Sequence, residues 1–272
     1  MKKSDLLLLI PHFNNPQGLL RSLKSVKEKE PLDVLVVDDG STEGRIDDAV
    51  IAQNVSSNLN INYCYLDGNR GIEHALNKGL AYAYDRGYTF IARLDCGDVC
   101  VPDRFAIQKS FLQKNKDIGI VGSFVRFLDM NNKFVYNLEL PVNNESIQKK
   151  MFLNSMFIHP TIMFRREVLD KVREYPVNYK AAEDYAFFFE VLKYYKGANI
   201  PEYLVFCEIN PYGLSIRKRK EQVKNRIKLI IRNFRFRWYA VYGLIRNIII
   251  CLVPYRIVLF VKSKLKGYGN KT

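Results

Sequence analysis

Short apolar runs alternate with segments of helical periodicity along the first half of the chain, and this alternation limits the possible folds more than any other feature. Residues 6–10 and 34–37 are uninterrupted apolar runs of strand length, typical of strands buried on both faces. Apolar residues between them recur at helical spacing. The same alternation continues with predicted strands at 61–66, 89–94 and 118–127 and predicted helices at 71–86 and 102–114. It predicts an α/β fold, with a mostly parallel sheet flanked by helices.

Acidic residues follow two of these predicted strands at the point where each strand ends. Asp38 and Asp39 come after the second apolar run, and Asp95 and Asp98 follow the predicted strand at 89–94. Ligands of parallel sheets bind at the carboxyl ends of the strands, where a buried carboxylate is costly unless it meets a cation, a donor or a ligand hydroxyl. The pattern predicts a binding site at this edge, although turns and helix caps also use Asp.

Six motifs occur in a fixed order along the chain. They are Pro11-His12-Phe13-Asn14, Val36-Val37-Asp38-Asp39-Gly40-Ser41, Asn69-Arg70-Gly71, Ala92-Arg93-Leu94-Asp95-Cys96-Gly97-Asp98, His159-Pro160-Thr161 and Glu183-Asp184-Tyr185. In their order and spacing these motifs resemble those of glycosyltransferase family 2, the inverting nucleotide-sugar enzymes with a GT-A (Rossmann-like) fold. The resemblance covers about residues 5–212 and is strongest to bacterial enzymes that build lipopolysaccharide, exopolysaccharide or capsule. It implies transfer of a sugar, expected to come from a UDP-sugar, to a lipid-linked glycan acceptor.

The resemblance implies a role for residues of the first motifs in binding the donor. Asp39, with Asp38 as its neighbour, is expected to bind the nucleotide base and ribose. Phe13 is expected beside the base, and Arg70 near the diphosphate. The remaining residues expected to bind substrate are Pro11, Arg93, Asp95, His159 and Glu183.

The family's metal motif usually reads Asp-x-Asp-Asp, and Gly97 stands here in place of the middle Asp. The resemblance implies Mn²⁺ or Mg²⁺, hard cations that prefer oxygen ligands, shared between carboxylates and the donor diphosphate. Asp98 is the expected main ligand, with Asp95 as the second. The alternative is that Asp98 only caps the helix predicted to open at Pro102.

The resemblance assigns the catalytic base to Asp184, which opens a predicted helix at 184–195. The metal would neutralise the leaving nucleoside diphosphate while the carboxylate deprotonates the acceptor hydroxyl for direct attack at the anomeric carbon. An Asp in a first helical turn is also favoured by the helix dipole alone. His159 is expected to contact the diphosphate or the acceptor, although a lone His is more often structural.

Basic residues are concentrated at the carboxyl end of the chain. Residues 215–272 hold 16 of the 42 Lys and Arg residues but only Glu221 of the 28 acidic residues. We therefore divide the chain into a GT-A body at 1–214 and a basic tail at 215–272. Within the body we expect a nucleotide-binding half at about 1–128 and an acceptor half at about 129–214, where further helices are predicted near 145–152 and 184–195.

The tail has the pattern of basic amphipathic helices. Apolar residues between Val223 and Ile245 fall on one helical stripe flanked by Lys and Arg, and Trp238 lies on it. Such a pattern predicts attachment to an anionic membrane surface. The stretch at 247–261 is nearly all apolar, but Arg246, Pro254 and Arg256 interrupt what would otherwise be a span, which favours lying on the membrane over spanning it. The alternative is a helix packed on the body with a solvated charged face.

Two other functions stay open at this stage. A nucleic-acid-binding protein would use the basic tail on phosphates, but it would leave the acidic edge unexplained, so no nucleic acid is expected. A catalytically degenerate nucleotide-sugar-binding or partner subunit is favoured by Gly97.

Five scattered Cys and no signal peptide predict a protein of the cytoplasm. With the tail, this becomes a peripheral protein on the cytoplasmic face of the inner membrane, and a homo-oligomer stays possible.

Overall fold

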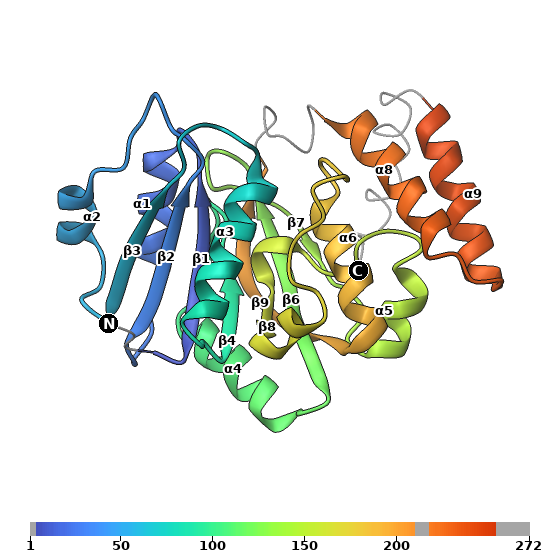
Figure 1. Cartoon of the computed structure of the whole chain (residues 1–272), viewed down its shortest axis with the longest axis horizontal. Coiled ribbons are helices and arrows are strands. Elements are labelled where there is room, and N and C mark those ends of the chain that lie inside the picture. Colours follow the sequence, from blue (N-terminus) through green and yellow to red (C-terminus); the bar gives the residue numbers. More distant parts are fainter. Residues whose placement is uncertain (1–3, 210–217, 254–272) are drawn as a thin grey trace.

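The computed structural model describes residues 4–209 and 218–253 (Figure 1). Their centre is a nine-stranded sheet with the strand order β3-β2-β1-β4-β8-β6-β9-β5, and β7 pairs with β6 outside this path. The strands are β1 Leu6–His12, β2 Leu32–Asp38, β3 Leu59–Tyr65, β4 Phe90–Arg93, β5 Val99–Cys100, β6 Ile118–Leu128, β7 Phe134–Leu138, β8 Met163–Arg165 and β9 Lys196–Glu208.

Helices cover both faces of this sheet. They are α1 Pro16–Ser25, α2 Asp48–Asn54, α3 Ile72–Asp85, α4 Arg104–Lys114, α5 Asn144–Lys150, α6 Glu183–Tyr194, α8 Arg219–Arg232 and α9 Trp238–Leu252, with the short 3-10 helices η1 His159–Thr161 and η2 Arg166–Asp170. The predicted α/β fold with a mostly parallel sheet is confirmed. β1 pairs in parallel with β2 and β4, and β2 with β3, whereas β8 runs antiparallel to both β4 and β6.

Two hydrophobic cores explain why the strands are apolar on both sides. Leu7 and Leu9 of β1 face a core that includes α3 and α6, while Leu6 and Leu8 face a second core with α1 and α4. β1 is consequently buried along nearly its whole length. Its carboxyl end and those of β2 and β4 emerge at one edge, which carries the predicted site.

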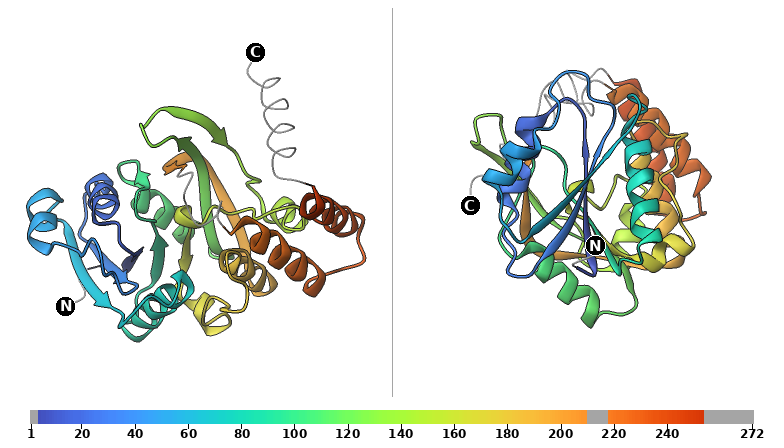
Figure 2. Two further views of the ribbon diagram at one scale, coloured as in Figure 1. Left: turned by 90° about the horizontal axis from the view of Figure 1, so that it is seen from above. Right: turned by 60° about the vertical axis from the view of Figure 1, so that its left-hand side comes forward.

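The tail contributes two helices, α8 and α9, that pack on the body beside α5 and α6 (Figures 1 and 2). The expectation of one continuous apolar stripe is wrong, because α8 ends at Arg232 and α9 begins at Trp238. Ile230 is buried against the body, whereas Trp238 and Ile245 are exposed. A turn therefore directs one apolar face inward and another outward.

A hydrogen bond and close packing also hold α8 and α9 against the body. Asn225 donates from Nδ2 to the carbonyl of Lys180 at 2.8 Å. Gly243 lies so close to Phe152 that a β-carbon there would come within 2.3 Å of its carbonyl oxygen. In the two described ranges, no helix combines the length and the apolar content needed to cross a membrane. Residues 210–217 and 254–272 lie outside the described residues. They include the predicted boundary between body and tail at 214 and 215, and the last part of the predicted tail.

Candidate active site

Asp38 joins the loops that follow β1 and β2. Its Oδ2 lies 2.7 Å from His12 Nδ1, and its Oδ1 accepts the Ser41 N–H at 2.6 Å. Because His12 Nε2 accepts the Asn15 N–H, the imidazole hydrogen lies on Nδ1 and is donated to Asp38. Burial acts to raise the pKa of Asp38, but these hydrogen bonds outweigh it and leave the pKa below its ordinary value. Both carboxylate oxygens therefore hold the loops in place.

Asp39 anchors the loop that carries Arg70. Its two oxygens accept the backbone N–H groups of Arg70 and Gly71, each at 2.9 Å. Burial raises the pKa of Asp39 despite these two bonds. Gly71 caps the start of α3 from the position before Ile72, with a φ of +107°, a conformation that favours glycine. The Arg70 side chain is exposed on this loop, and Phe13 is 44% exposed at the end of β1.

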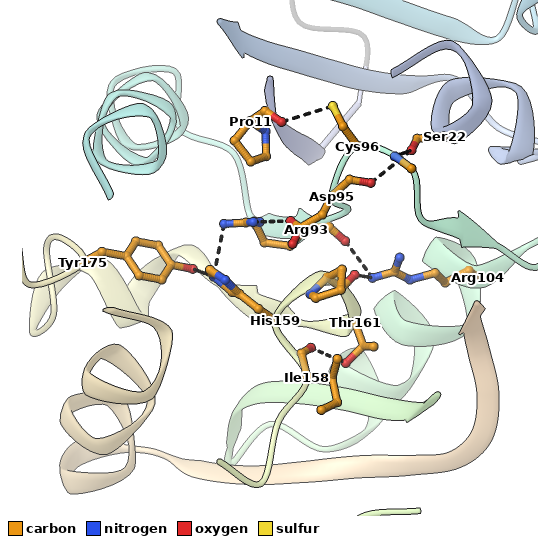
Figure 3. Close-up of polar contacts among 12 residues, drawn as sticks. Pro11, Ser22, Arg93, Asp95, Cys96, Arg104, Ile158, His159, Thr161 and Tyr175 are labelled. Carbon is orange, nitrogen blue, oxygen red and sulfur yellow. Dashed lines mark hydrogen bonds and ion pairs between the residues drawn. The ribbon is translucent and has the colours of Figure 1, made fainter. Parts of the chain in front are cut away.

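A chain of polar contacts behind β4 links the second acidic motif to His159 (Figure 3). Arg93 is completely buried; it donates from Nη2 to Asp95 Oδ1 and from Nη1 to His159 Nε2 at 3.1 Å. The Tyr175 hydroxyl lies 3.0 Å from the same nitrogen. Arginine can only donate, so His159 Nε2 is an acceptor and the imidazole is neutral. Burial, with the charge of Arg93, lowers the pKa of His159 well below its ordinary value.

Asp98 lies deeper than Asp95. Its Oδ1 accepts the Glu208 N–H of β9 at 3.0 Å. Burial and then the nearby charge of Asp95 raise the pKa of Asp98 to about 7. The alternative that Asp98 caps the next helix is wrong, since Glu28 accepts the Phe105 and Ala106 N–H groups at the start of α4. Two carboxylates close together, one of them buried, suit a divalent cation.

The loop between these two carboxylates fits a glycine at position 97. Gly97 has a φ of +100°, and its N–H donates to Ser22 Oγ at 2.9 Å, so an Asp at this position would be strained. No group of three or more His, Cys, Asp and Glu side chains among the described residues could hold a metal ion. Asp98 and Asp95 therefore fit Mn²⁺ or Mg²⁺ only if the donor diphosphate and water complete the coordination, which is how Mg²⁺ is commonly bound.

Asp184 and Glu183 open α6 beside this cluster. Asp184 Oδ1 accepts the N–H of Tyr185 at 2.7 Å. Burial raises the pKa of Asp184, while the charges of Arg226 and Arg93 oppose the rise and that of Asp95 adds to it. Burial and the charge of Asp184 raise the pKa of Glu183 to about 7, and the buried Glu183 Oε2 has no hydrogen-bond partner among the residues that the structure describes. Asp184 thus shares the electrostatic environment of the second acidic motif.

The sequence did not identify three residues that organise this site. Arg104 is completely buried and donates from Nη2 to the carbonyls of Arg93 and Pro160, at 2.8 and 2.7 Å (Figure 3). It fixes the end of β4 to η1. Tyr175 supports His159, and Arg226 of the tail acts on Asp184. None of the three belongs to a recognisable motif, so only the fold brings them to the site.

The comparisons agree with this architecture. The family model described as Glycosyl transferase family 2 matches residues 8–173. The amylovoran biosynthesis glycosyltransferase AmsE of Erwinia amylovora is 23% identical over 268 residues, covering 96% of this chain and 98% of that protein. The UDP-Gal:alpha-D-GlcNAc-diphosphoundecaprenol beta-1,3-galactosyltransferase of Escherichia coli is 26% identical over 272 residues, covering 99% and 95%.

A solved structure also resembles the chain along its whole length. The mannosyltransferase PcManGT from Pyrobaculum calidifontis, in complex with GDP-Man and Mn²⁺, has a TM-score of 0.64 at 15% identity and covers all of this chain and 82% of its own. This likeness confirms the GT-A fold expected from the resemblance. Because the family model matches more than half of the residues of this chain, the chain belongs to glycosyl transferase family 2.

Proposed function

We propose that this protein transfers a sugar from a nucleotide diphosphate sugar, expected to be a UDP-sugar, to a lipid-linked glycan in bacterial surface polysaccharide biosynthesis. Family membership supports the transfer of a sugar. Two relatives support the donor, the acceptor and the pathway class, since one is named for UDP-Gal and a diphosphoundecaprenol acceptor and the other for amylovoran biosynthesis.

One observation carries the proposal beyond the family. The charges of Arg93 and Asp95, at the end of β4, act on the pKa of Asp184 at the start of α6. The residue expected to activate the acceptor is therefore near the residues expected to hold the donor diphosphate. A single displacement needs both groups at one anomeric carbon.

The reaction is a direct displacement with inversion. Asp184 takes the proton of the acceptor hydroxyl, whose oxygen forms the new bond to the anomeric carbon while the bond to the diphosphate breaks. The N–H of Tyr185 holds one Asp184 oxygen, which orients the carboxylate. Arg93 orients Asp95 through their ion pair. Asp98 and Asp95 would hold Mn²⁺ or Mg²⁺, which supplies positive charge to the leaving nucleoside diphosphate.

We also propose peripheral attachment to an anionic membrane through α9. Exposed apolar residues line its outer face, and Arg235 and Arg237 precede the helix. Aromatic and apolar side chains next to arginines suit the interface of an anionic bilayer. The exposed residues are Trp238, Val241, Tyr242, Ile245, Ile248, Ile249 and Leu252.

A thermal-shift experiment tests the donor site. UDP-, GDP- and dTDP-sugars and CMP-sugars are each added with Mn²⁺, Mg²⁺ or a chelator, because a ligand of the native state raises the apparent stability. One nucleotide class is expected to stabilise the protein, and only with a metal ion. Asp98→Asn should lose this stabilisation, whereas Asp85→Asn, an exposed residue at the end of α3, should keep it. Stabilisation by none of them would favour a degenerate site.

A further inference from the structure

Two arginines of the tail helices act on Tyr185, the residue that follows Asp184. Arg226 of α8 stands over the Tyr185 ring, with its guanidinium carbon 5.8 Å from the ring centre. Arg246 of α9 donates from Nη1 to the Leu153 carbonyl at 3.0 Å. Both charges act on Tyr185, and the charge of Arg246 acts on Arg226. The two arginines therefore converge on the start of α6, although they come from different helices.

The surrounding contacts hold both arginines in place. Asn225, next to Arg226, donates to the Lys180 carbonyl, and Asn247, next to Arg246, donates to the Leu153 carbonyl at 3.3 Å. The Tyr185 hydroxyl donates to the Met151 carbonyl. Such contacts fix the backbone on either side of the pair, unlike the setting of arginines on a freely solvated helix face.

The pair has more positive charge than its neighbours balance. In the described part of the chain, neither Arg226 nor Arg246 forms an ion pair with a carboxylate within 4.0 Å. Both side chains are only partly exposed, so water screens their repulsion incompletely. An anion bound between them would relieve this repulsion. Guanidinium groups match phosphate oxygens through paired N–H donors.

We propose that Arg226 and Arg246 bind the diphosphate of the lipid-linked acceptor. This inference rests on the proposed function. The donor diphosphate has its own expected partners in Arg70 and the second acidic motif, whereas α8 and α9 lie beyond α6, at the far end of the molecule from β2 and β3 (Figure 1). The helix that carries Arg246 also exposes the apolar face proposed to meet the membrane. A diphosphate there would place the first sugar of the acceptor next to Asp184.

A binding experiment on the full chain tests the arginine pair without transfer. Inorganic pyrophosphate is the probe, titrated by calorimetry in a chelator so that no metal ion recruits it to the donor site. Arg226→Gln and Arg246→Gln should each weaken binding by about tenfold, because each removes a charge-assisted hydrogen-bond donor. Arg226→Lys should recover part of the loss. Lys228→Gln is the matched control, since Lys228 is an exposed base of the same helix.

Excess UDP separates the two possible sources of a diphosphate. Pyrophosphate should bind equally well in its presence if the arginines form a second site. Displacement by UDP would overturn the proposal and assign the pair to the donor. Equal pyrophosphate affinity in the wild type and both Gln variants would also overturn it, provided that circular dichroism shows all of them folded.

A kinetic experiment tests the acceptor itself. The same sugar is offered once on a lipid diphosphate and once on a neutral alkyl glycoside. Arg246→Gln should raise KM for the diphosphate acceptor by about tenfold and leave KM for the neutral acceptor unchanged, because Arg246 is held at the Leu153 carbonyl, whereas it is Arg226 whose charge acts on Asp184. An equal loss with both acceptors would overturn the assignment, because it would mean that the substitution only disturbs the start of α6. If the wild type uses neither acceptor, the proposed function fails, while the pyrophosphate titration still decides the inference.

Discussion

At the scale of single residues, burial and nearby arginine charges have opposite effects on the pKa values of the carboxylates at the start of α6. Burial raises the pKa of Asp184, and the positive charges of Arg226 and Arg93 limit the rise. A raised pKa makes Asp184 a stronger proton acceptor than an ordinary Asp, while the two arginine charges favour its ionised form.

Replacement of Asp184 tests its role as the base. Asp184→Asn keeps the size of the side chain but removes its proton affinity, so transfer should fall by about 10²- to 10⁴-fold while donor affinity stays the same. The measurements are kcat for transfer and the nucleotide dissociation constant. Asp85→Asn is the control for a lost surface carboxylate. Unchanged transfer in Asp184→Asn would exclude this residue as the base.

The pKa of Glu183 leads to a second prediction, which concerns how the free energy of unfolding depends on pH. Its folded-state pKa is raised to about 7 by burial and by Asp184, so between the ordinary Glu pKa and 7 the folded state holds more protons than the unfolded state. The free energy of unfolding contributed by Glu183 therefore falls as pH rises through this window. Glu183→Gln should gain stability relative to the wild type when Tm is compared at pH 8 and at pH 5. A constant difference in Tm would contradict the raised pKa.

At the scale of elements, the strands and helices with strong periodicity were predictable, and those formed by long-range pairing were not. The apolar runs that became β1 and β2 are buried on both faces, which leaves a direct signal in sequence. β9 contains Lys, Glu and an internal Pro201, and it forms because β6 pairs with it. The position of the acidic motifs at one edge of the sheet was predictable for the same reason, since these motifs directly follow the apolar runs of the strands.

α4 provides a prediction at this scale. The Glu28 carboxylate accepts two N–H groups of its first turn, and α4 carries Arg104, which fixes β4 to η1. Glu28→Ala should lower the free energy of unfolding by about 1 kcal/mol, the usual effect of losing a helix cap, without changing which nucleotide binds. Urea denaturation measures it, with the exposed Glu30→Ala as control. Equal stability of both variants would mean that the cap contributes nothing.

At the scale of the whole molecule, the tail both completes the body and faces away from it. Leu229 and Ile230 of α8 are buried in the same core as α6, and the charge of Arg226 acts on Asp184. The count of basic residues identified the tail. The contribution of the tail to the site, however, depends on a turn between Arg232 and Trp238, which the apolar periodicity of the sequence did not predict. Removing the tail would therefore damage the body, so attachment is better tested on its surface.

Substitutions on the outer face of α9 test attachment while the body stays intact. Trp238 and Leu252 are each 78% exposed, so replacing both with Ser should affect neither the core nor nucleotide affinity. The full chain should sediment with phosphatidylglycerol vesicles more than with phosphatidylcholine vesicles, because both apolar contact and arginine charge contribute. The double variant should lose most of this binding. Sedimentation equal to the wild type, or a preference for single-stranded nucleic acid over vesicles, would contradict membrane attachment through α9 and leave the charge of the tail to another partner.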